Sequence, residues 1–147
     1  MTKKLSKFYL LTLMSVPLLA CSASTSTSVS IIKDGVKISA KIGNTSINDS
    51  TKAHFVHAKL IVHGSGKGLK SINLNCFALT VGNVTSDEID VDSIASVLND
   101  PYPADTHGRI DVAVYWVFSD GRGFDIQKLP SAKLSLKSYA SSPCFRY

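Results

Sequence analysis

The amino-acid sequence predicts an all-β fold, and three observations carry this prediction. Apolar and polar residues alternate with a period of two in several segments, which is the pattern of strands with one buried face. Residues that favour helices are scarce, since the 147-residue chain has one glutamate and one glutamine. Short turn signals rich in glycine, aspartate and proline separate the alternating segments. Together these features predict a two-sheet sandwich of about seven short strands.

The first half of the predicted domain begins with a hairpin. Val29–Ile32 and Val36–Ile42 flank an Asp34-Gly35 pair that suits a tight turn. His54–His63 is the next strand, with every second residue apolar. The Gly64–Gly68 stretch that follows has a lysine among glycines, but it lacks the six-residue frame and the Ser or Thr of a phosphate-binding loop. We therefore expect it to be a connecting loop.

Two segments depart from regular alternation. In Leu69–Val81 the apolar positions change parity near Cys76, which predicts either a β-bulge or a strand covered on both faces. Asp92–Leu98 is the one segment with helical spacing of apolar residues, so we expect a single helical turn there.

The second half contains the strongest strand pattern, Ile110–Phe118. Ser119–Gly123 is expected to turn the chain into Phe124–Leu129 as a hairpin, and Ala132–Leu136 is expected to be the last strand. The strands of both halves together predict one sandwich domain of immunoglobulin or fibronectin type III character. The Cys-Trp-Cys spacing of true immunoglobulin domains is absent, because Trp116 lies 40 positions after Cys76.

The N-terminus predicts export from a bacterial cytoplasm. Residues 1–20 form a signal peptide, with three lysines before an apolar run that is too short to cross a bilayer comfortably. The run ends in Leu18-Leu19-Ala20-Cys21, which resembles a bacterial lipobox and implies lipidation of Cys21. Residues 21–28 then read as a Ser/Thr-rich tether and residues 29–147 as the sandwich domain.

Two locations follow from this N-terminus. Acylation of Cys21 predicts an outer-membrane lipoprotein, facing the periplasm or the cell surface, whose only membrane contact is its lipid anchor. Ordinary cleavage after Ala20 or Ala23 predicts a secreted protein instead.

Charge argues against a nucleic-acid partner. Three of the formal +5 charges belong to signal-peptide lysines, which leaves 13 basic and 11 acidic residues, a net charge of +2. The charges also form blocks, since residues 22–86 carry a net +5, residues 87–125 a net −7 and residues 126–147 a net +4. These blocks predict either ion pairs between neighbouring strands or a polarised surface that attracts a charged partner.

Cys76 and Cys144 remain in the domain whichever way the signal is cleaved. An even number of cysteines in an oxidising compartment predicts a disulfide. Metal binding by this pair is disfavoured, because neither residue has a second Cys or His at zinc-ligand spacing.

The sequence gives little support for a metal site or a cofactor. Asp87–Asp92 holds four carboxylates, which predicts a solvated strand edge, with calcium as the alternative. The four histidines are spaced too far apart for a metal site on one strand, because His57 and His63 stand about 20 Å apart. We expect no metal and no cofactor.

The sequence also predicts that the protein is not an enzyme. Serines are abundant, but the chain has no Gly-x-Ser-x-Gly motif, and both cysteines are expected to be oxidised. Asp111, Asp120 and Asp125 are candidates for paired-carboxylate chemistry, yet their positions suit strand and turn residues better.

A protein partner is the favoured ligand, because aromatic residues and arginines typical of binding hot spots accumulate in the second half of the domain. The candidate partner-binding residues are Tyr102, Arg109, Tyr115, Arg122 and Phe124. Tyr115 shares the second face of its strand with Ala113 and Val117, so this face is either core beneath another sheet or a surface for a partner.

The segments Ile89–Ile94, Tyr102–Asp105, Gly108–Val112 and Tyr115–Phe118 resemble small secreted bacterial proteins of the interleukin-receptor-mimic family. The resemblance covers roughly 30 residues without a diagnostic motif, and implies a fibronectin III-like fold and binding of a host receptor or cytokine ligand. A lipid anchor departs from that family, whose members are released. The alternative is an outer-membrane lipoprotein that is structural or inhibits a cell-wall enzyme.

Overall fold

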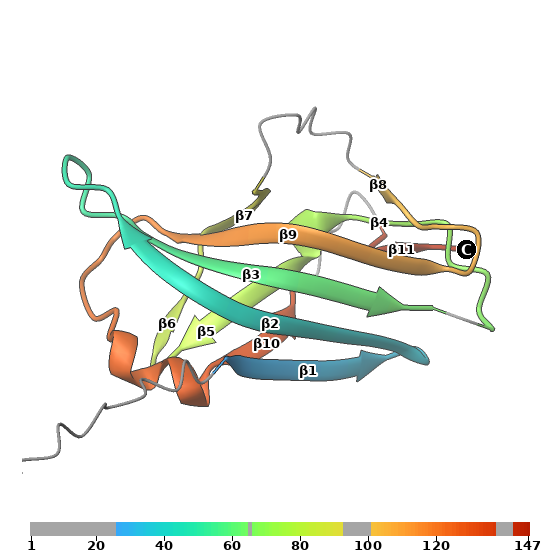
Figure 1. Cartoon of the computed structure of the whole chain (residues 1–147), viewed down its shortest axis with the longest axis horizontal. Coiled ribbons are helices and arrows are strands. Elements are labelled where there is room, and N and C mark those ends of the chain that lie inside the picture. Colours follow the sequence, from blue (N-terminus) through green and yellow to red (C-terminus); the bar gives the residue numbers. More distant parts are fainter. Residues whose placement is uncertain (1–25, 65, 93–100, 138–142) are drawn as a thin grey trace, which may run out of the picture.

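The computed structural model of the chain describes residues 26–64, 66–92, 101–137 and 143–147. The predicted signal peptide and Cys21 lie outside these residues, as does Ser93–Leu98 of the expected helical turn. The elements, in chain order (Figure 1), are β1 (Thr27–Lys33), β2 (Val36–Ile47), β3 (His54–His63), β4 (Ser71–Ile72), η1 (Leu74–Cys76), β5 (Phe77–Val81), β6 (Val84–Thr85), β7 (Glu88–Val91), β8 (Tyr102–Pro103), β9 (Arg109–Phe118), η2 (Ile126–Ser131), β10 (Lys133–Leu136) and β11 (Phe145–Arg146).

All of the paired strands run antiparallel and form three sheets. The largest sheet has the order β1-β2-β3-β9-β7, and two three-stranded sheets have the orders β10-β5-β6 and β11-β4-β8. The two small sheets lie behind the large sheet (Figure 1), and together they form the second layer of a sandwich. Seven of the described strands have four or more residues, which confirms the predicted all-β sandwich.

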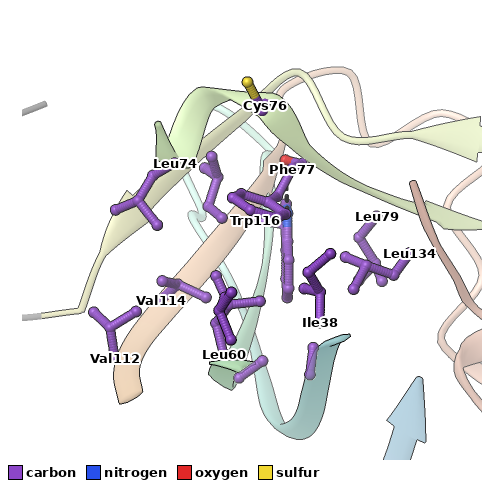
Figure 2. Packing of buried hydrophobic residues seen from close by; sticks show 14 of the residues in the cluster. Ile38, Leu60, Leu74, Cys76, Phe77, Leu79, Val112, Val114, Trp116 and Leu134 are labelled. Atoms are coloured by element: carbon purple, nitrogen blue, oxygen red, sulfur yellow. Dashed lines mark hydrogen bonds between the residues drawn. The ribbon is translucent and has the colours of Figure 1, made fainter. Parts of the chain in front are cut away.

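The core fills the space between the two layers. Trp116 of β9 is completely buried, and its indole N–H donates a 3.2 Å hydrogen bond to the carbonyl oxygen of Phe77 in β5. Figure 2 shows side chains of the large sheet facing Leu74, Phe77, Leu79 and Leu134 of the opposite layer. One direct polar contact in an apolar core therefore links the two layers at their centre.

The first hairpin forms where the sequence predicted it. Lys33 pairs with Val36, and the two residues between them have positive φ angles of 53° at Asp34 and 80° at Gly35. This combination defines the two-residue hairpin turn that matches the twist of the flanking strands. Strand β1 begins at Thr27, two residues before the expected start of the domain, because Thr27 and Ser28 already pair with β2.

The change of parity near Cys76 has a different cause from the predicted bulge. The chain makes a turn of 3-10 helix, η1, between β4 and β5, and the Asn73 side chain accepts a 2.9 Å hydrogen bond from the amide of Asn75 at its start. Residues Phe77, Ala78 and Leu79 are then all buried, so β5 is covered on both faces. This is the second of the two explanations that the sequence predicted.

The predicted hairpin after β9 was wrong. Residues Ile126–Ser131 form the 3-10 helix η2 instead, with the Asp125 side chain accepting a hydrogen bond from the amide of Gln127. Pro130 has no amide hydrogen to donate to a strand ladder, which explains why this segment does not join a sheet. Strand β10 follows as predicted, but the short β11 comes after it.

The disulfide between Cys76 and Cys144 is present, with Cα atoms 5.6 Å apart. It joins the last residue of η1, immediately before β5, to the residue before β11, so it links the two small sheets. Among residues 26–64, 66–92, 101–137 and 143–147, no helix is long and apolar enough to cross a membrane.

Candidate functional site

The structure does not bring the five candidate partner-binding residues together. Arg109 lies at the first residue of β9, whereas Arg122 lies in the loop beyond its last residue and pairs with Asp120 at 2.8 Å. Tyr102 belongs to β8 in a different sheet, and Phe124 packs its ring against Phe118 at a centroid distance of 4.8 Å. Tyr115 lies on an open face of the large sheet, and Arg109 lies on the same face at the other end of β9.

That open face is the outer side of the five-stranded sheet. Every second residue of β3 and β9 points away from the core, and these side chains are half-buried or exposed rather than covered. The sequence left open whether the second face of β9 is core beneath another sheet or a surface. Among the residues that the structure describes, no second sheet covers this face, so it is a surface. The outer face comprises Phe55, His57, Lys59, Ile61 and His63 of β3 with Arg109, Asp111, Ala113, Tyr115 and Val117 of β9.

An aromatic patch lies on this face, near the start of β3 and the end of β9. The rings of Phe55 and Tyr115 meet edge to face with centroids 5.7 Å apart, and the His57 ring lies 5.8 Å from that of Tyr115. The Tyr115 hydroxyl donates a 2.9 Å hydrogen bond to a carboxylate oxygen of Asp90 on β7. Partial burial, followed by this bond and the nearby negative charges, raises the pKa of Tyr115. Tyr115 is therefore held as a neutral donor with a defined ring orientation.

The charges on this face are arranged by strand. Lysines lie on β2 and β3, whereas carboxylates lie on β9 and β7. Lys59 of β3 pairs with Asp111 of β9 at 3.0 Å, and Arg109 approaches the same carboxylate at 3.3 Å. Burial opposes ionisation of Asp111, but the hydrogen bonds and charges of Lys59 and Arg109 outweigh it and lower its pKa. The charge blocks of the sequence therefore pair between strands here, and the face remains basic on one side and acidic on the other.

Three side chains from three parts of the chain form a hydrogen-bonded relay on the same face. The Nδ1 atom of His57 lies 2.8 Å from Oδ2 of Asp92, and its Nε2 atom lies 3.1 Å from Oγ of Ser46. Asp92 has no proton to donate when it is ionised, so Nδ1–H donates to it and Nε2 is left as the acceptor for the serine hydroxyl. We call Ser46, His57 and Asp92 the relay.

A β-bulge places Ser46 in the relay. Even-numbered residues of β2 up to Ile42 face the core, and without an irregularity Ser46 would face it too. Between the pairs Ile42↔Ala58 and Thr45↔Val56, however, β2 has two residues, Gly43 and Asn44, where β3 has one. This extra residue reverses the parity, so Ser46 pairs with Phe55 and shares its outer face.

The position of Asp92 depends on β9. The amide of Asp92 donates a 2.9 Å hydrogen bond to the carbonyl oxygen of Ala113, which continues the β7–β9 ladder by one residue. His57 belongs to β3, on the other side of β9, and its ring reaches across that strand to the Asp92 carboxylate. Ala113 projects from β9 on the same face, and its small side chain leaves room for this contact.

A shallow hollow of about 490 Å³ opens beside the relay. His57 and Asp92 line one part of it, and the bulge residues Gly43 and Asn44 line another. Lys41 also borders the hollow and forms no ion pair with any other residue that the structure describes. The hollow is therefore lined by two of the three relay residues, His57 and Asp92, and by the positively charged Lys41.

The remaining acidic candidates have separate contacts. Asp87 accepts a hydrogen bond from the amide of Ser119, and Asp90 from Tyr115, so the carboxylates of the Asp87–Asp92 segment point to different partners. Asp125 begins η2. No group of three His, Cys, Asp or Glu residues suited to a metal ion occurs within the described ranges.

The sequence did not reveal the relay, because its members are 11 and 35 positions apart and match no motif. One signal was present: Gly43-Asn44 interrupts an alternating strand, and a glycine inside a strand is typical of a bulge. Comparisons of the chain with models of known protein families, with curated proteins and with solved structures find no match.

Proposed function

We propose that the chain is an exported protein-binding module that contacts its partner through the outer face of the five-stranded sheet. The observation that supports this most directly is the aromatic patch around Tyr115, which lies on an open sheet face. Tyrosine and other aromatic rings are enriched at the centres of interfaces because they bury a large area at a small cost in conformational entropy.

The chemistry of the face indicates the kind of partner. Lys37 and Lys41 line its β2 side, and Glu88 and Asp90 line its β7 side. A complementary protein would place acidic residues over β2 and basic residues over β7, with an apolar group against Tyr115. In line with the resemblance noted from the sequence, we propose a host receptor or cytokine ligand as that partner; an envelope protein is the alternative.

Affinity capture with purified processed protein tests the proposal. Host extracellular proteins and envelope proteins are offered separately, and any captured partner is measured again with Tyr115→Ser. We expect its affinity to fall at least roughly 30-fold, the effect of removing a central hot-spot side chain. Ile126→Ser is the matched control, because Ile126 is 56% exposed on η2, outside the outer face. An unchanged affinity for Tyr115→Ser in folded protein would contradict the proposed surface.

The location of the protein separates the two classes of partner. Release into the medium supports a host-directed ligand, whereas retention in outer-membrane fractions supports an envelope role. Cys21→Ala is expected to abolish incorporation of labelled fatty acid. Unchanged incorporation would remove the proposed lipid anchor.

A further inference from the structure

We propose that Ser46 is a nucleophile activated by His57 and Asp92, and that the hollow beside them admits a small carboxylic ester whose acyl group Ser46 accepts. This activity goes beyond binding of a protein partner and does not depend on it. It would also make the protein an acyl-transfer enzyme, contrary to the expectation from sequence motifs.

The first argument is the direction of the two hydrogen bonds. Asp92 accepts from Nδ1–H of His57, at 2.8 Å, so the proton of a neutral imidazole is held at Nδ1. The lone pair of Nε2 then points to the Ser46 hydroxyl, 3.1 Å away, and can take up its proton. A serine hydroxyl, a base and a carboxylate that orients the base are the three parts of a nucleophilic relay, which is recognised by geometry and not by chain order.

The second argument is that the fold gives the relay access to a substrate. The bulge at Gly43 and Asn44 turns Ser46 out of the core, and Ser46 is exposed at the surface. Bulges occur frequently beside active sites, where they redirect a side chain. The hollow borders His57 and is also lined by Lys41, whose ammonium group is free to attract negative charge on a carbonyl oxygen.

The reaction balances with water as the only co-reactant. Ser46 Oγ bonds to the ester carbonyl carbon while its proton passes to Nε2 of His57. The bond from that carbon to the alcohol oxygen then breaks, and the alcohol leaves with the proton from His57. Water, deprotonated by the same nitrogen, releases the acyl group as a carboxylic acid and restores Ser46. Because the hollow is shallow and open, we expect small or flexible acyl groups as substrates.

Labelling with a fluorophosphonate probe, which reacts with activated serines, tests the proposal on the processed protein. We expect one labelled site, identified as Ser46 by peptide mass spectrometry, and no labelling in Ser46→Ala. Ser39→Ala is the matched control, because Ser39 lies on the same face of the same strand, outside the relay. Absence of labelling in the folded wild-type protein, or equal labelling of several surface serines, would overturn the proposal.

Variants of the base distinguish activation from mere exposure. His57→Gln is expected to slow labelling of Ser46 by about 100-fold or more, the usual contribution of a positioned general base. His63→Gln, a change on the same strand and face, is expected to leave the rate unchanged. Asp92→Asn preserves shape while removing the charge, and is expected to slow labelling at least about tenfold; it serves as the second variant if His57→Gln does not fold. Equal rates in wild type and Asp92→Asn would contradict the relay.

The same proteins test hydrolysis with p-nitrophenyl acetate. A rapid first release of nitrophenolate that disappears in Ser46→Ala is the expected result. The labelling and hydrolysis assays contain no protein partner, so failure of the relay and failure of the proposed binding surface are separable outcomes.

Discussion

The disulfide between Cys76 and Cys144 is expected to supply a large part of the stability of the domain. The decisive perturbation is the double substitution of both cysteines by alanine, because a single substitution leaves a free thiol that can form unwanted bonds. Cys76 is completely buried, and the substitution removes one sulfur atom from each of the two side chains. The change therefore tests the cross-link more than the packing.

The magnitude follows from the length of the loop that the bond closes. The two cysteines are 68 positions apart, and a loop of that size corresponds to about 4 kcal/mol on the loop-entropy model. Backbone hydrogen bonds hold the same segments together independently of the disulfide. The amide of Asn73 donates to the carbonyl oxygen of Cys144 at 3.0 Å, and that of Lys137 to the carbonyl oxygen of Cys76 at 2.7 Å. We therefore expect the double variant to keep the native fold with lower stability.

Equilibrium denaturation with urea, followed by tryptophan fluorescence, measures this loss. The expected decrease in the free energy of unfolding is about 4 kcal/mol, which corresponds to a fall in melting temperature on the order of 10–20 °C. The control is the wild-type protein with its disulfide reduced, which should show a similar loss. A decrease in the free energy of unfolding of less than about 1 kcal/mol would refute the view that this cross-link restricts the conformations of the unfolded chain.

Two further predictions concern the core and the outer face. Trp116→Phe removes the indole donor to the Phe77 carbonyl and leaves that buried oxygen without its partner, so urea denaturation followed by circular dichroism should show a loss of about 1–3 kcal/mol. An unchanged midpoint would mean that the bond contributes nothing. For Asp111, whose pKa is lowered in the folded state, the stabilisation is present above the unfolded pKa and is lost as the pH falls through the folded pKa. The stability difference between wild type and Asp111→Asn should therefore be largest near neutral pH and shrink below about pH 4, and a difference that is constant with pH would contradict the ion pairs.

The regular strands were predictable because one face of each is buried against the core. Val36–Ile42, His54–His63 and Ile110–Phe118 all alternate, and their inward positions are those that the structure buries. The tight turn at Asp34 and Gly35 was predictable as well, because few residue pairs tolerate positive φ at both positions.

The two 3-10 helices were not predicted, although local signals for both were present. Asn73 and Asp125 each accept a hydrogen bond from the amide two residues later, which is a common way to begin a turn. Alternating apolar residues nearby gave a strand pattern that competed with these signals. At η2 the packing of Phe124 against Phe118 removes the apolar residue that would have begun the predicted strand.

The binding surface was predicted only in part. Tyr115 was identified as lying on a second apolar face, and the structure leaves that face open. Its neighbours Phe55 and His57 come from a strand more than 50 positions earlier in the chain, so they could not be placed beside it without knowing that β3 pairs with β9. Composition alone grouped Tyr115 with arginines that lie at opposite ends of its strand.

The relay depends on register even more strictly, because side chains alternate between faces and a shift of one residue moves every one of them to the other face. If β2 paired with β3 in unbroken register through Gly43 and Asn44, Ser46 would turn into the core and Ile47 would come to the outer face. His57 and Asp92 would then still meet across Ala113, but Nε2 would lack the serine hydroxyl. The Gly43-Asn44 bulge is thus the local feature on which the chemistry of this face depends, and it interrupts a strand that hydrophobic alternation alone would have continued in phase.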